Sequence, residues 1–270
     1  MAEYCRRLRP LLREGAVVLG GAMDKYLSKN MLAVLSAKMG PTHTTLGRKK
    51  ARLSVTRVGP APDSARPQRQ RYRAEPFDLY VTSLPGTFSA QKLDVGTRFL
   101  LEHFAQIPIA SSRTIADLGC GNGILGVVAA ALNPGANVSF FDDSSFAIAS
   151  ARLSVAANFA AEERFDFNHA DGLLPDADRL FDVVLCNPPF HLGGQQDTFV
   201  AQRLFAQASK ALHPDGELWV VGNRHLRYHT SLRRHFVDVS VVASNRKFLL
   251  LRARQPRPRH AGASIQSRNE

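Results

Sequence analysis

The sequence predicts an α/β protein built on a mainly parallel sheet with helices on both of its faces. Between residues 113 and 221, short apolar runs of strand length alternate with segments of helical periodicity. A glycine-rich turn, Gly119-Cys120-Gly121-Asn122-Gly123, joins the first apolar run to the helix after it. In open sheets of this kind, ligands bind beyond the carboxyl ends of the strands.

The order of elements in this segment is strand, helix, strand, helix, strand, strand, helix, strand. A strand pair then follows and closes a mixed sheet of seven strands, typical of methyltransferases that use S-adenosylmethionine (SAM). The expected strands are Thr114–Leu118, Val138–Phe141, Phe165–Asn168, Val183–Cys186, Leu218–Val221, Val237–Ala243 and Lys247–Ala253, and the helices are Ile124–Leu132, Phe146–Asn158 and Phe199–Leu212.

Outside this core, the sequence predicts an edge strand at Tyr80–Ser83 and a helix over Lys92–Phe104. Further on, Pro214-Asp215-Gly216 is expected to turn, and Ser231–Phe236 to be helical.

Residues 1–58 repeat the order of elements found near the C-terminus. The expected elements are, in order, a helix (Tyr4–Leu12), a strand (Ala16–Gly20), a helix from Ser28 to Met39 with Ser28 as its N-cap, and one or two strands over Thr42–Val58. Arg48-Lys49-Lys50 lie at the turn between the strands. We interpret this as an internal repeat, with chance similarity of two α/β segments as the alternative. The expected domains are 1–58, the last part of a degenerate methyltransferase-like domain; 59–75, a Pro/Arg-rich linker; 76–254, the catalytic domain; and 255–270, a disordered basic tail.

Charge is distributed unevenly along the 270 residues. The net charge of +12 consists of +11 in residues 1–75, −3 in residues 76–250 and +4 in residues 251–270. Basic flanks of this kind commonly hold phosphate backbones, and a solvated basic tail is the alternative.

Several classes of protein are disfavoured by composition. No apolar run approaches the about 20 residues that span a bilayer, so no membrane partner is expected. Cys5, Cys120 and Cys186 show no disulfide or metal-ligand spacing, so we expect a reducing cytoplasm and no metal. We also expect a monomer. Cys120 and Cys186 are expected to be small buried fillers.

The glycine-rich turn is the first part of the predicted ligand site. Gly119, Gly121 and Gly123 allow the backbone to approach a ligand closely, although a purely structural turn is the alternative. Asp117 ends the preceding strand, where its charge disfavours a dinucleotide pyrophosphate and favours a ligand with an ammonium group. SAM has such a group.

Acidic residues also follow the next two strands. Asp142 lies about 20 residues beyond the glycine turn, where its carboxylate can accept hydrogen bonds from both ribose hydroxyls. We prefer it to Asp143, whose charge suits the next helix N-terminus. Asp171 follows the third strand and can accept a hydrogen bond from an adenine amino group. It is an equally good interpretation that Asp171 is an acidic residue of a surface loop without a ligand.

The sharpest motif is Asn187-Pro188-Pro189-Phe190 after the fourth strand. Two prolines hold the backbone rigid and remove competing amide donors. The Asn187 side-chain oxygen and the Pro188 carbonyl can then both accept from one planar NH₂ group, while Phe190 offers a stacking face. This arrangement predicts methyl transfer to a planar nitrogen, which needs no general base at the start.

A family resemblance rests on three stretches: residues 117–123, Asn187-Pro-Pro-Phe-His191 and Gly222-Asn-Arg-His-Leu-Arg-Tyr228. Together they resemble the bacterial ribosomal RNA guanine-N2 methyltransferases over about residues 76–253. The 23S rRNA methyltransferase G family is most similar, followed by its 16S relative, methyltransferase C. The resemblance implies that Phe88 and Ser89 belong to a segment that closes over SAM. It also implies two related domains, of which this chain contains the first only in part.

The resulting hypothesis is SAM-dependent methylation of a guanine N2 in ribosomal RNA, most readily 23S rRNA free of protein or early in assembly. The alternatives are 16S rRNA, a release-factor glutamine, and an RNA-binding relic without catalysis. The release-factor enzymes usually have Tyr where this chain has Phe190. For His191 and His225, RNA contact and local structure are equally good interpretations.

Overall fold

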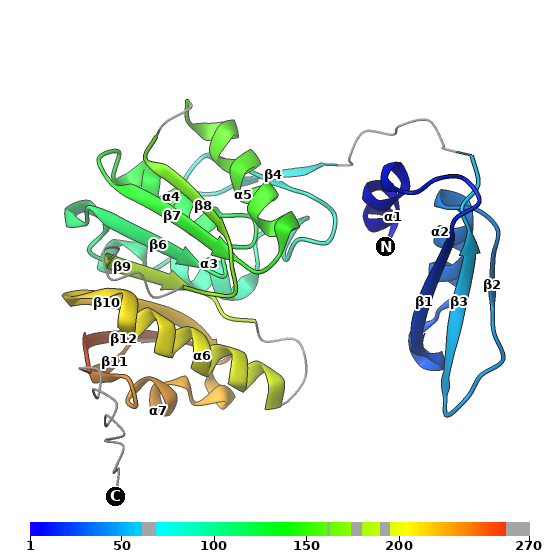
Figure 1. Ribbon diagram of the computed structural model, residues 1–270. Coiled ribbons are helices and arrows are strands. Elements are labelled where there is room, and N and C mark those ends of the chain that lie inside the picture. Colours follow the sequence, from blue (N-terminus) through cyan, green and yellow to red (C-terminus); the bar gives the residue numbers. More distant parts are fainter. Residues whose placement is uncertain (61–68, 161–162, 174–179, 190–194, 258–270) are drawn as a thin grey trace, which may run out of the picture. The chain divides into compact units, whose positions relative to one another are not determined.

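The computed structural model describes residues 1–60, 69–160, 163–173, 180–189 and 195–257. The chain divides into two compact units, an N-terminal unit of residues 1–68 and a C-terminal unit of residues 69–270 (Figure 1). Each unit has a sheet of its own, and each is described by itself.

The C-terminal unit contains the predicted seven-stranded mixed sheet. Its strand order is β11-β12-β10-β9-β6-β7-β8, in which β10 to β8 are parallel and β12 is antiparallel to both of its neighbours, β10 and β11. The strands are β6 (Thr114–Leu118), β7 (Asn137–Asp142), β8 (Phe165–His169), β9 (Phe181–Cys186), β10 (Leu212–Asn223), β11 (Phe236–Ser244) and β12 (Phe248–Pro256). Since β7 and β9 flank β6 on opposite sides, the chain reverses its winding direction at β6, which is where such sheets bind ligands.

Helices cover both faces of this sheet (Figure 1). One hydrophobic core joins the sheet to α3 (Val95–Leu101), α4 (Ile124–Leu132) and α5 (Ser145–Asn158). A second core joins the opposite face to α6 (Gln195–Ala211) and α7 (Tyr228–Leu232). Short 3₁₀ turns lie at Phe104–Gln106, Ile109–Ser111 and Arg224–Leu226.

Strand β9 shows why this segment forms a central strand. Val183 and Leu185 point into the first core, whereas Val184 and Cys186 point into the second. An apolar run that is buried on both faces is typical of a parallel sheet covered by two helical layers. Cys186 is a buried filler here, as the sequence predicts.

A two-stranded hairpin corrects two predictions. Strand β4 (Gln70–Ala74) occupies part of the predicted linker, and it pairs with β5 (Leu79–Ser83). The predicted edge strand is therefore not part of the main sheet. The backbone N–H groups of Thr82, on β5, and of Leu84, just after it, instead donate to side chains of α5: Thr82 to Ser154 Oγ (3.0 Å) and Leu84 to Ser150 Oγ (2.9 Å). These partners lie on α5, so the sequence around β5 does not reveal them.

Three predictions near the C-terminus are also wrong in detail. Residues 214–216, predicted to form a turn before the strand, belong to β10 itself, which pairs with β9 through an irregular register at this point. The predicted helix at Ser231–Phe236 lies earlier, as α7. Strand β12 extends through Gln255 and Pro256 into the predicted tail.

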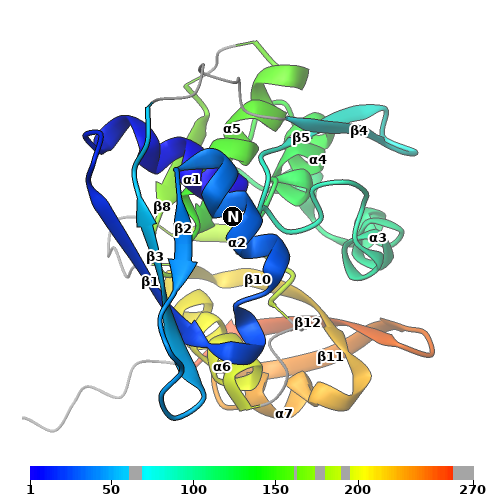
Figure 2. The same ribbon diagram turned by 90° about the vertical axis from the view of Figure 1, so that its right-hand side faces the viewer.

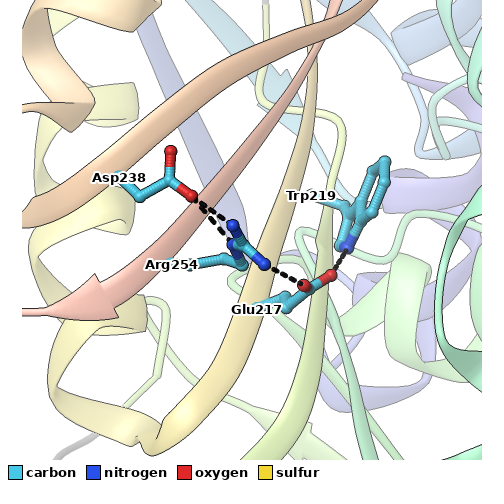
Figure 3. A network of polar contacts seen from close by, with 4 residues as sticks. All are labelled: Glu217, Trp219, Asp238 and Arg254. Carbon is cyan, nitrogen blue, oxygen red and sulfur yellow. Dashed lines mark hydrogen bonds and ion pairs between the residues drawn. The ribbon is translucent and has the colours of Figure 1, made fainter.

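A polar network fixes the pairing of β10, β12 and β11 (Figure 3). Arg254 on β12 donates to the Asp238 carboxylate on β11 (Nε to Oδ2, 2.9 Å) and lies 3.9 Å from the Glu217 carboxylate on β10. Glu217 also accepts from the Trp219 indole at 2.8 Å. Because Arg254 is paired with both Glu217 and Asp238 in the strand register, a slip of either strand would break these contacts.

The N-terminal unit has a three-stranded antiparallel sheet of order β1-β3-β2 (Figure 2). Its elements are α1 (Ala2–Leu8), a 3₁₀ turn (Arg9–Leu11), β1 (Val17–Met23), a 3₁₀ turn (Asp24–Tyr26), α2 (Lys29–Lys38), β2 (Thr42–Thr44) and β3 (Ala51–Arg57). Ser28 caps α2 as predicted, accepting from the Met31 amide at 3.1 Å. The turn before β3 places Lys49 and Lys50 at positive φ.

The strand order agrees with the arrangement that an internal repeat predicts. β10, β11 and β12 form the order β10-β12-β11, in which the last strand lies between the first two, as β3 lies between β1 and β2. Each set also has a helix before its first strand and another after it. The origin of residues 1–58 as part of a larger domain remains a proposal.

In the part of the chain that the structure describes, no helix has both the length and the apolar character needed to cross a membrane.

Candidate functional site

A cavity of about 360 Å³ opens at the carboxyl ends of β6, β7 and β9. It collects most of the residues predicted from sequence to bind a ligand, namely Phe88, Ser89, Asp117, Gly119, Gly121, Asp142, Asp171, Asn187, Pro188 and Pro189. Cys120 and Asp143 line it as well. Several other residues line the cavity without having been assigned a ligand role of their own from the sequence, among them Tyr72, Asp94, Thr97, Asn122 and Arg203.

The glycines of the turn have different roles. Gly119 (φ +71°) and Gly121 (φ +55°) line the cavity, and a Cβ at either position would meet open space. Gly123 (φ +81°) does not line it. A Cβ there would lie 2.9 Å from the Ala151 side chain and 3.2 Å from the Phe140 ring, so this glycine allows α5 to pack against the turn. Its structural role was the alternative interpretation of the sequence.

Asp117 lies almost completely inside the protein. Its side chain is 1% exposed, and Oδ2 accepts from the backbone N–H of Gly126 at 2.9 Å. Burial raises the pKa of this carboxyl to about 8; the Gly126 hydrogen bond lowers the pKa and the nearby Asp142 raises it. A carboxyl in such a place becomes charged readily only when a cation lies beside it.

Asp142 ties the end of β7 to the glycine turn. Its Oδ2 accepts from the Gly121 amide at 2.9 Å, and its Oδ1 accepts from the Ser144 amide at 2.9 Å. Burial raises the pKa of Asp142 despite these two hydrogen bonds, and Asp143 adds to the rise. Each carboxylate oxygen has a second acceptor site, so Asp142 can still bind ligand hydroxyls.

The side chain of Asn122 connects the glycine turn by hydrogen bonds to segments that precede the main sheet. Its Nδ2 lies 3.3 Å from each of three oxygens, the Tyr72 hydroxyl, Ser83 Oγ and the Ser89 carbonyl. Burial raises the pKa of Tyr72, which lies on β4 and lines the cavity. No sequence motif marks Tyr72, since its partner is 50 residues away.

Asp171 lies in the cavity wall but has a partner of its own. Both of its carboxylate oxygens accept from the Arg203 guanidinium of α6, and its backbone carbonyl accepts from Gln207 at 3.0 Å. The pair is partly exposed, with Asp171 58% accessible. An adenine amino group would therefore share Asp171 with Arg203, and the assignment of Asp171 to adenine stays a prediction.

Asn187 is oriented by two residues of the segment before β6. Its Nδ2 donates to Thr97 Oγ1 at 2.7 Å and to Asp94 Oδ2 at 3.3 Å. Its Oδ1 is buried and has no hydrogen-bond partner among the described residues. Asn187 therefore has an unused acceptor, and the residue lines the cavity beside Pro188.

Phe190 and His191 lie outside the described residues, so their predicted roles are not tested. His225 lies in an exposed 3₁₀ turn that begins directly after β10. No histidine occurs among the described residues that line the cavity.

Comparisons with known proteins identify related families for both units. Residues 78–252 match the family model "Methyltransferase small domain", and residues 1–60 match the "RLMG N-terminal domain". The "Ribosomal RNA large subunit methyltransferase G" of Shewanella sp. (strain MR-4) is 40% identical over 256 residues. Its counterpart from Pseudomonas aeruginosa (strain UCBPP-PA14) is 41% identical over 253 residues. The alignments cover 94% of this chain and 67% of each relative, so the chain spans about two thirds of their length.

A solved structure supports the fold independently. The T. thermophilus 16S rRNA N2 G1207 methyltransferase in complex with AdoMet and guanosine superposes with a TM-score of 0.79. The superposition covers 94% of this chain and 70% of that protein, at 23% sequence identity. It confirms the predicted class of fold, including an additional N-terminal part.

Proposed function

Because the chain belongs to the methyltransferase small domain family and to the ribosomal RNA large subunit methyltransferase G family, we propose that it methylates the exocyclic N2 of a guanine in 23S rRNA, using SAM. The observation that carries the proposal is the buried Oδ1 of Asn187, which has no partner among the described residues and belongs to a side chain that lines a cavity suited to SAM.

The residues around the cavity fit SAM chemically. Asp117 suits the ammonium group, since a buried carboxyl gains most from an adjacent cation. Gly119 and Gly121 leave open space in front of the backbone, and Asp142 retains acceptor capacity for ribose hydroxyls. When bound, SAM supplies a methyl group on a sulfonium, which a nitrogen lone pair can attack.

Asn187 and Pro188 would hold the target nitrogen. A guanine N2 is a planar NH₂ group whose lone pair is delocalised into the ring. Two acceptors, Asn187 Oδ1 and the Pro188 carbonyl, would fix that group and favour the positive charge that develops on it during transfer. The proton can leave after the transfer, so the residues need only orient the base and stabilise this charge.

Ribosomal RNA suits the charge distribution of the chain. The N-terminal 75 residues carry a net charge of +11, which favours contact with phosphates, whereas the cavity is lined by Asp94, Asp117 and Asp142. A guanine must leave its stack to enter the cavity, at a cost of a few kcal/mol, so a looped or protein-free RNA is the preferred substrate. Such a substrate places the protein in the cytoplasm.

We also infer that residues 1–58 derive from the last part of a methyltransferase-like domain. The match of residues 1–60 to the RLMG N-terminal domain and the shared strand order of the two sheets support this inference.

The test of the proposed function is transfer of a labelled methyl group from SAM. We expect N2-methylguanosine in unmodified 23S rRNA, identified by mass spectrometry of the nucleosides. Unmodified 16S rRNA and a release factor serve as the alternative substrates, and transfer to either one alone would contradict the proposal. Absence of transfer to all three would leave RNA binding without catalysis.

Binding of SAM should release a proton from Asp117. With a pKa of about 8, this carboxyl is protonated at pH 6.5 in the free protein, and the SAM ammonium would favour the charged form. Calorimetric titrations at pH 6.5 in two buffers of different ionisation enthalpy should therefore give different binding enthalpies. The difference should disappear in Asp117→Asn. Equal enthalpies for the wild-type protein would show that Asp117 does not change its protonation state.

A further inference from the structure

The side-chain amide of Asn187 can adopt two orientations that differ by a half-turn. In one, the oxygen faces the cavity and accepts from the target NH₂ group. In the other, the amide nitrogen faces the cavity and opposes that NH₂ group with two donors of its own. The neighbours of Asn187 decide between them.

Asp94 determines the direction in which the Thr97 hydroxyl, which Asn187 contacts, forms its hydrogen bonds. Its Oδ2 accepts from the backbone N–H of Thr97 at 2.9 Å, and a backbone N–H can only donate. The Thr97 hydroxyl also donates to this oxygen, at 3.4 Å. With its proton directed to Asp94, the hydroxyl offers its lone pairs to Asn187.

Only the nitrogen end of the Asn187 amide fits against these two groups. Nδ2 donates to Thr97 Oγ1 at 2.7 Å and to Asp94 Oδ2 at 3.3 Å. After a half-turn, the amide oxygen would face a carboxylate oxygen, which has no proton to donate. Thr97 is 5% exposed, so water does not readily replace the lost contact.

We propose that Thr97 and Asp94 are positioning residues that hold the acceptor oxygen of Asn187 toward the target nitrogen. They do so from α3 and its N-cap, about 90 residues earlier in the chain. The inference rests on the proposed function, because it concerns how Asn187 meets a planar NH₂ group.

The first test compares Thr97→Val with Thr97→Ser in methyl transfer to 23S rRNA. Valine keeps the shape of threonine and removes the hydroxyl, so we expect kcat to fall by about 10- to 100-fold while the Kd for SAM stays unchanged. Serine keeps the hydroxyl and should restore kcat to near the wild-type value. Asp94→Ser retains a helix cap but shortens the side chain, and it should lower kcat as Thr97→Val does.

Thr114 provides a matched control. Its Oγ1 donates to Asp182 Oδ2 at 3.2 Å, which is a similar contact at the opposite end of the sheet. Thr114→Val should lower the melting temperature without lowering kcat. An unchanged kcat in Thr97→Val, or a loss of kcat that serine does not restore, would overturn the proposal. A parallel loss of SAM binding in Thr97→Val would do the same, since it would indicate a general structural role.

A spectroscopic readout separates this proposal from the proposed function. The ¹⁵N side-chain signals of Asn187 in the free protein should show slow hydrogen exchange, and Thr97→Val should speed that exchange whereas Thr114→Val should not. This result would support the positioning role even if wild-type protein methylates none of the RNAs tested. Equal exchange in wild type and Thr97→Val would refute the role even if methylation is observed.

Discussion

Replacing Asn187 with alanine should lower kcat for methyl transfer by about 10²- to 10³-fold while leaving the Kd for SAM unchanged. The substitution removes Oδ1, which has no partner among the described residues, and in the proposed arrangement leaves only the Pro188 carbonyl to accept a hydrogen bond from the target nitrogen. Loss of one preorganised partner of a developing charge costs about 10²–10³ in kcat. Single-turnover transfer to 23S rRNA and calorimetric titration with SAM would measure the two quantities.

Asn168 offers a comparison for this variant. It is another partly buried asparagine near the carboxyl end of a strand, β8, and its Nδ2 donates to Asp166 (3.0 Å) and to the Phe140 carbonyl (3.3 Å). It does not line the cavity. Asn168→Ala should lose stability but retain kcat. Appreciable turnover in Asn187→Ala would show that Asn187 is not the acceptor.

Replacing Asp142 with alanine should weaken SAM binding by about 1.5–3 kcal/mol, the range for hydrogen bonds to a charged group. This corresponds to roughly a 10- to 150-fold rise in Kd. Two losses are expected, since the variant removes the proposed acceptor for the ribose hydroxyls and releases the Gly121 amide that Asp142 holds at 2.9 Å. Equilibrium titration with SAM in the absence of RNA measures the effect directly.

The neighbouring residue Asp143 provides a control for the effect of Asp142→Ala on SAM binding. Asp143 also lines the cavity, but neither oxygen of its side chain holds the glycine turn in the contacts of the described residues. Asp143→Ala should therefore change the Kd for SAM far less than Asp142→Ala. If the two variants weaken binding equally, or if Asp142→Ala leaves the affinity unchanged, the ribose assignment is wrong.

The parts of the fold that follow from local pattern could be predicted from the sequence. Helix α4 and strand β6 have the predicted bounds, because an apolar run, a glycine turn and Asn133-Pro134 define their ends. The cavity residues at the ends of β6, β7 and β9 could also be predicted, because parallel strands bring their carboxyl ends to one edge of the sheet.

The residues that were missed depend on contacts between distant segments. Tyr72 reaches Asn122 from a hairpin that resembles a linker in composition, and Thr97 reaches Asn187 from a helix 90 residues earlier. Gly123 was predicted to contact the ligand because the sequence does not distinguish a glycine that a ligand requires from one that close packing against Ala151 requires. Arg203 was missed because an arginine on an amphipathic helix usually faces solvent.

The buried position of Asp117 also affects the stability of the protein itself. In the unfolded chain this carboxyl ionises near its ordinary pKa of 3.8, but in the fold it keeps its proton to about pH 8. Between these values the unfolded state gives up a proton that the folded state retains, so rising pH lowers the free energy of unfolding by at most about 1.4 kcal/mol per unit. A cationic ligand on Asp117 opposes this loss. The ligand-free fold is thus less stable at the pH at which Asp117 is ionised, and a cation bound beside Asp117 would offset part of that loss.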